Sequence, residues 1–244
     1  MKYGIFGSSG KMSKCLLECS KNFKQVQCVK VINRDFKLEE VQDLDCIIDF
    51  STPLSSINLL KNLFGLKNIF VVCGTTGFTK EEFLEYNNLT SGTKVLYSAN
   101  FSLGVFKVSK ALKDLTIAFK EYDVEILEKH HNLKKDAPSG TALKFGKIVA
   151  DAKNIDFDQV KTFDRNHKRE KDEIGFCSIR QGSIFGFHEV SFASNDERIW
   201  IGHEAFNKNI FANGAIESAI KANKVLKHEQ YGLFTLEDLE SNVF

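Results

Sequence analysis

The sequence predicts an α/β fold, with an N-terminal Rossmann-like parallel-sheet domain and a second α+β domain built on a mostly antiparallel sheet. Three observations predict it. In the first hundred residues, short apolar runs alternate with helical patterns, which is typical of βαβ units. The turn Gly7-Ser8-Ser9-Gly10 follows the first apolar run. After residue 170, three strand-like runs follow one another with little helix between them, which favours antiparallel pairing.

Five apolar runs in the first half fit strands. The run 46–50 is almost continuously apolar, as expected for a parallel strand that is covered on both faces. Pro53, after two capping hydroxyls, marks one helix start, and the capping box of Thr79 and Glu82 marks another. The expected strands are residues 3–6, 26–32, 46–50, 68–73 and 94–98.

The pattern changes after residue 101. The stretch 156–173 carries charges of both signs and is expected to be a solvated loop. Helical spacing is found at 105–115, 142–152 and 213–226. The expected strands of this half are 124–128, 174–180, 185–193 and 198–203.

Composition excludes several classes of function. The chain of 244 residues is 43% hydrophobic with a formal net charge of +1, so no global field recruits nucleic acid or an acidic membrane surface. No run approaches the roughly 20 apolar residues that a membrane span needs. The six cysteines form no Cys-x-x-Cys pair, and we find no convincing set of metal ligands. These observations predict a soluble, cytoplasmic protein with reduced, mostly buried thiols.

The first glycine-rich turn has the features of a dinucleotide-binding turn. Gly7 permits a tight turn, and Gly10 permits close approach of the backbone to a pyrophosphate at the helix N-terminus. Ser13 takes the place of the usual third glycine. After the second strand, where an acid often binds the ribose, the chain has Asn33 and Arg34. Arg34 is suited to a 2′-phosphate, which indicates NADP or a relaxed choice; the alternative is that both are ordinary polar residues leaving a strand.

Two more loops belong to the same edge of the predicted sheet. Gly74-Thr75-Thr76-Gly77 ends the fourth strand, and Ser98-Ala99-Asn100-Phe101 ends the fifth. Ligands of open α/β sheets bind outside the carboxyl ends of the strands, so we expect these loops to contact a cofactor.

Residues 127–142 combine a proton-transfer group with a site for an anion. His130, His131 and Lys134 lie close together in sequence. Histidine titrates near neutral pH, and lysine supplies a compact cation. The following Ser139-Gly140-Thr141 turn opens a helical pattern and offers hydroxyls and backbone N–H groups to an anion. A solvated basic loop is the alternative, but the paired histidines and the Pro-Ser-Gly sequence favour an active-site loop.

These motifs together resemble the 4-hydroxy-tetrahydrodipicolinate (dihydrodipicolinate) reductase family over nearly the whole chain. The most specific is Glu-x-His-His-x-x-Lys-x-Asp-Ala-Pro-Ser-Gly-Thr-Ala at 128–142. The resemblance also rests on the glycine turn at 7–12, Asp49-Phe50-Ser51, Gly74–Phe78, Ala99–Val105, Arg180-x-Gly182, Gly186-x-His188, Phe211–Ala215 and the tail at 231–239.

The resemblance implies NADPH- or NADH-dependent reduction of a cyclic dicarboxylate, 4-hydroxy-tetrahydrodipicolinate, in lysine and diaminopimelate biosynthesis. It implies a dinucleotide-binding domain of residues 1–101 plus 210–244, and a domain at 102–209 for substrate binding and assembly of a homotetramer. His130 would be the proton-transfer residue and Lys134 the proton donor. His131, Ser139, Gly140 and Thr141 would bind substrate. The cofactor would contact Gly7, Ser8, Ser9, Gly10, Lys11, Met12, Arg34, Gly74, Thr75, Thr76, Ser98, Ala99, Asn100 and Phe101.

Two other classes of function remain to be weighed. A nucleotide-sensing module that has lost catalysis should lack some motif residues of the active-site loop in its second half. In this chain the motif at 128–142 is complete. An aspartate-semialdehyde dehydrogenase needs a nucleophilic cysteine in the substrate half. Cys177 is the only candidate there, and it lies in a strand pattern.

Overall fold

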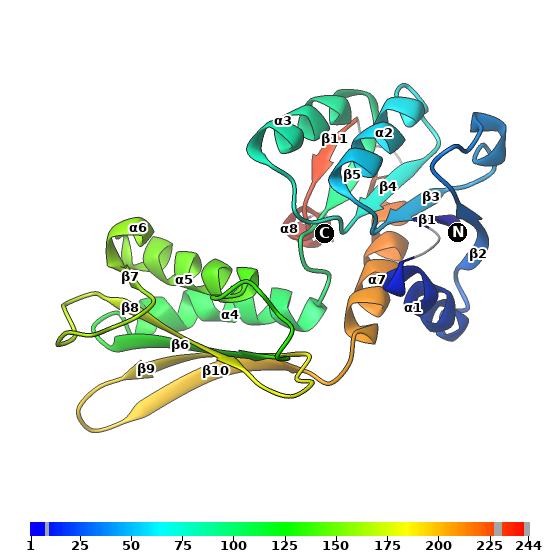
Figure 1. Ribbon diagram of the computed structural model, residues 1–244. Coiled ribbons are helices and arrows are strands. Elements are labelled where there is room, and N and C mark those ends of the chain that lie inside the picture. The colour runs from blue at the N-terminus through cyan, green and yellow to red at the C-terminus, as the bar shows by residue number, and fades with distance from the viewer. Residues whose placement is uncertain (8–9, 227–230, 242–244) are drawn as a thin grey trace. The chain divides into compact units, whose positions relative to one another are not determined.

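The computed structural model describes residues 1–7, 10–226 and 231–241, and it divides the chain into two compact units (Figure 1). The first unit comprises residues 1–102 together with the segment from Asn209 onward. The second unit is Leu103–Lys208. The chain therefore leaves the first unit once and returns to it with its C-terminal segment.

The first unit is a parallel sheet with helices on both faces, as the alternation of strands and helices predicts. Figure 1 shows α2 and α3 on one face of this sheet and α1 and α7 on the other. Its elements are β1 (Lys2–Phe6), α1 (Lys11–Cys19), η1 (Ser20–Asn22), β2 (Gln27–Ile32), η2 (Leu38–Glu40), β3 (Cys46–Asp49), α2 (Pro53–Leu63), β4 (Phe70–Cys73), α3 (Lys80–Leu89), η3 (Thr90–Gly92), β5 (Lys94–Tyr97), α7 (Asn209–Val225), β11 (Gly232–Phe234) and α8 (Leu236–Ser241).

The order of the strands places a ligand-binding crevice at one point of this sheet. The order is β11-β5-β4-β3-β1-β2, and every neighbouring pair is parallel. From β1 the chain crosses to β2 on one side, whereas β3, β4 and β5 extend on the other. The order thus reverses between β1 and β3, and ligands of open α/β sheets bind outside the carboxyl ends of the strands at such a point.

The core explains why these runs form strands. Every residue of β3 and of β4 is buried, because helices cover both faces of the sheet. The predicted helix starts are confirmed. Pro53 lies in the first turn of α2, and the Thr79 side chain accepts a hydrogen bond from the Glu82 N–H at 3.1 Å while the Glu82 carboxylate accepts from the Thr79 N–H at 2.8 Å.

The second unit is a five-stranded sheet in the order β10-β9-β6-β8-β7, with α4 and α5 packed against it. The predicted α+β class is confirmed, but the sheet is mixed. The pairs β10–β9 and β9–β6 are antiparallel, while β6–β8 and β8–β7 are parallel. The elements are α4 (Leu103–Ala118), β6 (Asp123–His130), α5 (Gly140–Lys153), α6 (Phe157–Val160), β7 (Lys161–Thr162), β8 (Ile174–Arg180), β9 (Gly186–Ala193) and β10 (Arg198–Ala205).

The parallel pairs have a simple cause. The α5 helix connects β6 to the strands that follow, so β6, α5 and β8 form a crossover, and a crossover brings its two strands together in parallel. The sequence pattern predicted the three consecutive strands β8, β9 and β10. It did not show that β6, which precedes α5, lies between β8 and β9 in the sheet.

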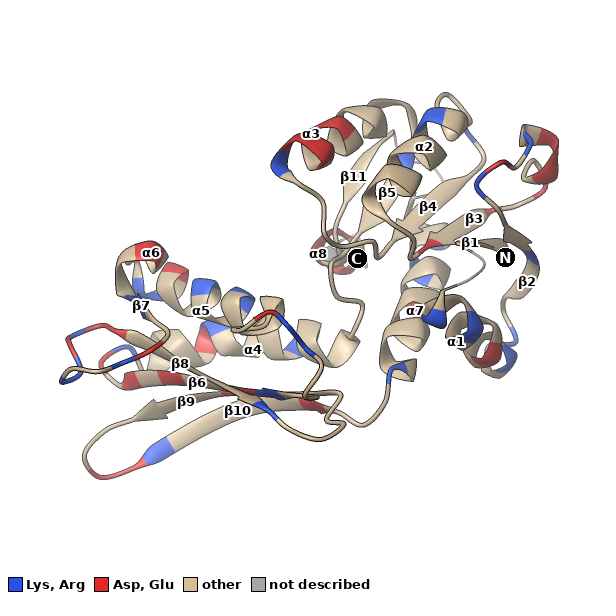
Figure 2. Ribbon diagram, in the orientation of Figure 1, with Lys and Arg blue, Asp and Glu red and all other residues tan. Residues whose placement is uncertain are grey.

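The charged segment 156–173 is a mostly exposed loop from residue 163 onward, as its sequence predicts, but its first part is regular. It begins with α6 and β7, and Figure 2 shows acidic and basic residues along the loop that follows β7. Arg165 forms ion pairs with Glu125 on β6 and with Glu173, and Arg169 also pairs with Glu125. These ion pairs hold the segment against the sheet.

The thiols were expected to be mostly buried, and no segment was expected to span a membrane. Cys15, Cys19, Cys46 and Cys73 are buried and all six thiols are free, but Cys177 is exposed, because its side chain lies on the face of β8 away from the helices. Among the residues that the structure describes, no helix is long and apolar enough to span a membrane.

Candidate active site

In the second unit, the end of β6 places a carboxylate and an imidazole side by side. Residues two apart in a strand share a face, and the burial of β6 alternates, so Glu128 and His130 both lie on its buried face. The Glu128 side chain is 1% exposed, and its Oε2 accepts a hydrogen bond from His130 Nδ1 at 2.5 Å. A carboxylate this deeply buried requires further partners.

Arg180, at the end of the neighbouring β8, is the main partner of Glu128. Its guanidinium donates to both carboxylate oxygens, at 2.9 Å to Oε2 and 2.7 Å to Oε1. The backbone N–H of Ser139 donates to Oε1 at 3.2 Å. Burial alone would raise the pKa of Glu128, but hydrogen bonds from Arg180, Ser178 and His130 outweigh it and lower the pKa to about 2. Glu128 is therefore ionised at neutral pH.

His130 is held in a mostly buried position with its second nitrogen beside a glycine. A Cβ on Gly186 would lie 3.2 Å from His130 Nε2, so the absence of a side chain there leaves room for the ring. Burial lowers the pKa of His130. Glu128 opposes that effect, whereas the positive charges of Lys134 and Arg180 add to it. The net shift is downward, so the neutral imidazole is favoured near neutral pH.

The loop after β6 is tied to the same cluster. Lys134 donates to Asp136 Oδ1 at 2.8 Å, and its backbone N–H donates to the His131 carbonyl at 3.1 Å. Arg180 donates to the Asp136 carbonyl oxygen at 2.6 Å. Arg180 thus connects the carboxylate beside His130 to the loop that carries Lys134.

Ser139 begins α5 and forms the turn that the sequence predicts. It is the N-cap residue, and its hydroxyl accepts from the Ala142 N–H at 3.3 Å. Gly140 follows, with no heavy atom within 4 Å of where its Cβ would stand, and Thr141 is half-buried in the first turn. The N-terminus of this 14-residue helix therefore has the N–H groups and the open space that an anion needs.

A second histidine lies against this cluster. His188, on β9, is buried and contacts the His130 ring edge to face at 5.1 Å. Its Nε2 lies 2.8 Å from the Ser139 hydroxyl. Burial lowers the pKa of His188 to about 3, with help from the nearby His130, so the ring is neutral at physiological pH. His188 lies on β9, within the strand expected at 185–193.

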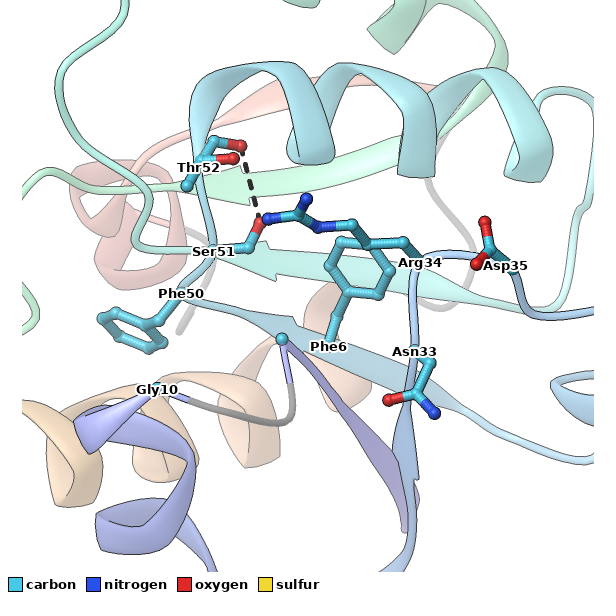
Figure 3. A pocket seen from close by; sticks show the side chains of 9 residues that line it. Phe6, Gly10, Asn33, Arg34, Asp35, Phe50, Ser51 and Thr52 are labelled. Atoms are coloured by element: carbon cyan, nitrogen blue, oxygen red, sulfur yellow. Dashed lines mark hydrogen bonds between the residues drawn. The ribbon is translucent and has the colours of Figure 1, made fainter.

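In the first unit, a pocket of about 400 Å³ lies at the crevice between β1 and β3 (Figure 3). It includes the N-cap residues of two helices, Gly10 of α1, which has no side chain, and Thr52 of α2, whose side chain makes no capping hydrogen bond. The lining residues are Phe6, Gly7, Gly10, Asn33, Arg34, Asp35, Phe50, Ser51 and Thr52.

The described part of the glycine turn has a backbone conformation that depends on glycine. Gly7 has φ of +95°, a conformation that favours glycine, and a Cβ there would lie 3.3 Å from Ser51 Cβ. The buried Ser13 hydroxyl donates to the Gly7 carbonyl, so the serine that replaces the third glycine stabilises the turn. Lys11 and Met12 form the first turn of α1. The predicted cofactor residues Ser8 and Ser9 lie outside the described residues.

Asn33 and Arg34 line the same pocket as the glycine turn. Figure 3 shows the Arg34 side chain extended across the pocket toward the loop of Ser51 and Thr52. Both residues are exposed. A guanidinium in this position is available to an anionic group bound in the pocket.

The loops after β4 and β5 meet the pocket through Phe50 and Ser51. A Cβ on Gly74 would lie 2.2 Å from the Phe50 ring, and the ring of Phe101 packs against Phe50 with centroids 5.9 Å apart. The Ser51 N–H donates to the Thr75 hydroxyl at 3.1 Å. Thr76 is exposed in the same loop, and the Ser98 hydroxyl donates to the Asn100 carbonyl at 2.8 Å, with exposed Ala99 between them.

A buried carboxylate stands behind these loops. Asp49 accepts from the Ser51 N–H at 2.9 Å and from the Ser56 hydroxyl at 2.5 Å. Burial raises its pKa, and the hydrogen bonds from the two serines limit that rise. Asp49 therefore fixes the turn from β3 into α2, which forms one wall of the pocket.

The structure gathers the sequence-derived residues into two sites, one in each unit, and adds residues that the sequence analysis did not assign to a site. In the second unit, the additions are Glu128, Arg180 and His188. In the first, they are Asp35, Phe50, Ser51 and Thr52. The signal for Glu128 was present, because it ends the strand expected at 124–128 and precedes His130 by two residues; β6 continues to His130. Arg180 and His188 lie about 50 residues away along the chain, and only the sheet pairing brings them close.

Comparison with known proteins gives matches to both units. The family model described as "Dihydrodipicolinate reductase, N-terminus" matches residues 1–101, and the model described as "Dihydrodipicolinate reductase, C-terminus" matches residues 104–239. A 4-hydroxy-tetrahydrodipicolinate reductase of Rickettsia bellii is 40% identical and covers 98% of this chain and 94% of its own. One from Clostridium novyi is 38% identical, with 96% of each chain covered.

Solved structures show the same fold. A dipicolinate-bound dihydrodipicolinate reductase from Paenisporosarcina sp. TG-14 matches with a TM-score of 0.71 at 24% identity, covering 96% of this chain and 97% of its own. A C. glutamicum DAP dehydrogenase in complex with DAP matches with a TM-score of 0.57 at 12% identity, over 100% of this chain and 99% of its own. At these identities the two structures establish likeness of fold.

Proposed function

The chain belongs to the dihydrodipicolinate reductase family, and from that membership we propose that its two units divide the reaction between cofactor binding and proton transfer. It is an oxidoreductase that reduces 4-hydroxy-tetrahydrodipicolinate to tetrahydrodipicolinate in diaminopimelate and lysine biosynthesis, with a nicotinamide cofactor. One observation supports the division most strongly: the first unit has a glycine-lined pocket at its switch point, and the second has a histidine, a lysine and an open helix N-terminus in one cluster.

The residues of the first unit fit a dinucleotide. The start of α1, directly after Gly10, offers helix N-terminal N–H groups to the pyrophosphate, and the carboxyl ends of β1, β2 and β3 with the loops that follow them line the pocket. When bound, the nicotinamide supplies a hydride. The residues that would hold the cofactor are Gly7, Ser8, Ser9, Gly10, Lys11, Met12, Asn33, Arg34, Gly74, Thr75, Thr76, Ser98, Ala99, Asn100 and Phe101.

NADPH is proposed to be used at least as well as NADH. Arg34 lines the pocket and is suited to the 2′-phosphate of NADPH, and Asn33 does not repel that phosphate. Arg34→Ala should therefore raise KM for NADPH and leave KM for NADH nearly unchanged. Asn33→Asp should shift the preference toward NADH, because a carboxylate accepts from the ribose diol and repels a phosphate. If both variants changed KM for NADPH and KM for NADH by the same factor in steady-state kinetics, this assignment would be contradicted.

Lys134 is assigned as the proton donor and His130 as the proton-transfer residue. Addition of a hydride to an unsaturated imine builds negative charge that needs a proton or a cation nearby. Lys134 supplies both, and its positive charge acts on His130. The neutral imidazole that burial favours is suited to accept and pass on a proton.

The substrate is a cyclic dicarboxylate, and its carboxylates have partners in the second unit. Ser139, Gly140 and Thr141 present N–H groups and hydroxyls at the start of α5, and His131 lies at the end of β6 beside the loop of Lys134. These four residues are assigned to substrate binding.

The catalytic assignment is tested by turnover of variants. His130→Gln and Lys134→Ala should each lower kcat by roughly 10²–10⁴-fold, the size of general acid–base catalysis, with little change in nucleotide affinity. Lys135→Ala removes an exposed lysine from the same loop and should keep normal turnover. Near-normal kcat in both test variants would remove this loop from the chemistry.

We further propose that the chain assembles as a homotetramer through the second unit. The α4 and α5 helices pack against its sheet, and β10 alternates between half-buried and exposed residues, with Trp200 58% exposed. An aromatic side chain of this size on an open strand is typical of an interface. Trp200→Glu should give a smaller species in light scattering than the unmodified chain. A cytoplasmic location stays a prediction.

A further inference from the structure

We propose that Glu128 is a positioning residue for the reaction: it fixes His130 in the tautomer that carries hydrogen on Nδ1, and it connects that imidazole to the anion-binding turn of Ser139. This inference rests on the proposed role of His130 and deepens it. It assigns which ring nitrogen gains and loses the proton, and it gives the buried ion pair with Arg180 a part in the reaction as well as in the fold.

The hydrogen-bond chemistry of Glu128 determines the tautomer. An ionised carboxylate can only accept hydrogen bonds, so the His130 nitrogen that lies 2.5 Å from Oε2 must carry the hydrogen. That nitrogen is Nδ1. In the neutral imidazole, Nε2 then has the free lone pair, and it is the atom that takes up and releases the proton.

Arg180 keeps Glu128 in its ionised form. Its two hydrogen bonds reach both carboxylate oxygens, and bidentate pairing of this kind is the strongest geometry available to a carboxylate. The charge balance matters because Glu128 is buried, where an unpaired carboxylate would be protonated instead. A protonated Glu128 could donate to Nδ1 and reverse the tautomer.

The same carboxylate also sets the position of the substrate turn. Its Oε1 accepts from the Ser139 N–H, and the Ser139 hydroxyl caps α5 and lies 2.8 Å from His188 Nε2. Glu128 therefore holds three elements together: the end of β6 with His130, the end of β8 with Arg180, and the start of α5 with its N–H groups. A shift of this carboxylate would displace the proton-transfer group and the anion site together.

Replacement by glutamine makes a specific prediction. Two donors with fixed hydrogens, Arg180 Nη2 and the Ser139 N–H, point at Oε1, whereas only Arg180 Nη1 does so at Oε2 besides His130, so the amide oxygen of Glu128→Gln should occupy the position of Oε1. The amide NH₂ then replaces Oε2 and faces His130 Nδ1. Since an NH₂ group donates, His130 should change to the tautomer with hydrogen on Nε2.

The test is ¹⁵N NMR of the full chain labelled at histidine, recorded above the pKa of His130. The His130 signals among the six histidines are assigned by their loss in His130→Gln. The charged or titratable groups that face His130 are Glu128 on its own strand, Lys134 in the loop, Arg180 on β8 and His188 on β9. The expected result is hydrogen on Nδ1 in the unmodified chain and on Nε2 in Glu128→Gln.

Kinetics provide the second readout. Glu128→Gln should lower kcat by about 10–100-fold, with KM for the nucleotide unchanged, as happens when a partner that orients a histidine is lost. Glu128→Asp keeps the charge and should recover part of the turnover and of the Nδ1–H form. The matched control is Glu125→Gln, which removes another arginine-paired carboxylate of β6 from the opposite face and should keep both the tautomer and the turnover.

Two results would overturn the proposal: hydrogen on Nε2 in the unmodified chain, or a Glu128→Gln variant with an unchanged tautomer and unchanged kcat. The first result is measured on the unmodified chain, so it does not depend on whether a variant folds. A failure of the proposed function would look different from a failure of this proposal: His130→Gln would turn over normally, whatever the tautomer of His130 in the unmodified chain.

Discussion

His188 shows at the scale of one residue how the site depends on pH. Its ring is buried between His130, Phe145 and the Ser139 hydroxyl, and burial lowers its pKa to about 3. In the unfolded chain, the same ring titrates at its usual value near 6.5. Between these two values the unfolded chain binds more protons than the folded one, so stability falls as the pH falls from about 6.5 toward 3.

This difference predicts an acid sensitivity that belongs to His188. By linkage, the lowered pKa of folded His188 should reduce the free energy of unfolding by about 2 kcal/mol between pH 7 and pH 5. Trp200, the single tryptophan, lies on β10 of the second unit, so its fluorescence in urea reports the unfolding of that unit. His188→Gln should lose this part of the pH dependence. An equal loss of stability in both proteins between pH 7 and pH 5 would contradict the shifted pKa.

Thr141 should act mainly on binding of the substrate. A hydroxyl that donates to a carboxylate does so before the reaction as well as during it, so Thr141→Val should raise KM more than it lowers kcat. A hydrogen bond to a charged group predicts an increase of roughly tenfold. Thr162→Val, beside the start of β8 and away from its carboxyl end, is the control and should leave KM unchanged.

The same site should bind a planar dicarboxylate. Pyridine-2,6-dicarboxylate should inhibit competitively with the substrate, and more weakly in Thr141→Val. Inhibition that is competitive only with the nucleotide would place the anion site elsewhere.

At the residue scale, the sequence predicted side chains that are close along the chain. His130, Lys134 and Ser139 lie within ten positions of one another, and the residue types in this motif indicate proton transfer and anion binding. Arg180 and His188 were not assigned to the site, because their proximity to His130 depends on which strands pair with β6. A pattern of single residues carries no information on that pairing.

At the scale of elements, the cofactor pocket depends on close packing between consecutive loops. Gly74, after β4, has no side chain because the Phe50 ring, after β3, occupies that space. Phe50 in turn packs on Phe101, after β5. Three strand ends are thus packed around one aromatic ring, and a change in one should disturb the others.

Gly74→Ala tests this packing. The new Cβ would lie 2.2 Å from the Phe50 ring, so the ring must move, and we expect KM for the nucleotide to rise while the substrate KM stays unchanged. Thr79→Ala is the control in the same segment. It removes the N-cap of α3 and should cost about 1 kcal/mol of stability without a change in nucleotide KM. Equal nucleotide KM values for Gly74→Ala and the unmodified chain would show that Phe50 does not shape the pocket.

The elements themselves were largely predictable, because apolar periodicity and caps act locally. The capping box at Thr79 and the proline at Pro53 gave helix starts that the structure confirms. The helix expected at 213–226 begins one turn earlier, at Asn209, and ends at Val225. The parallel pairing of β6 with β8 was missed, since it follows from the crossover through α5 and not from either strand alone.

At the scale of the whole molecule, the first unit is built from two distant parts of the chain. The β11 strand completes the sheet beside β5, and α7 packs against α1 and the strands β3 and β4. The Lys94 ammonium donates to the Leu226 carbonyl at 3.1 Å, which connects β5 to the end of the α7 segment. The second unit is therefore an insertion, and the first unit requires the segment that follows it.

The central claim is that this chain transfers a hydride from a nicotinamide cofactor to a cyclic dicarboxylate. The most direct measurement is the steady-state oxidation of NADPH and of NADH, followed by absorbance, with enzymatically generated 4-hydroxy-tetrahydrodipicolinate as the substrate. We predict oxidation of nicotinamide cofactor that requires the substrate, at a rate for NADPH that at least equals the rate for NADH. The absence of substrate-dependent oxidation with either nucleotide would contradict the account.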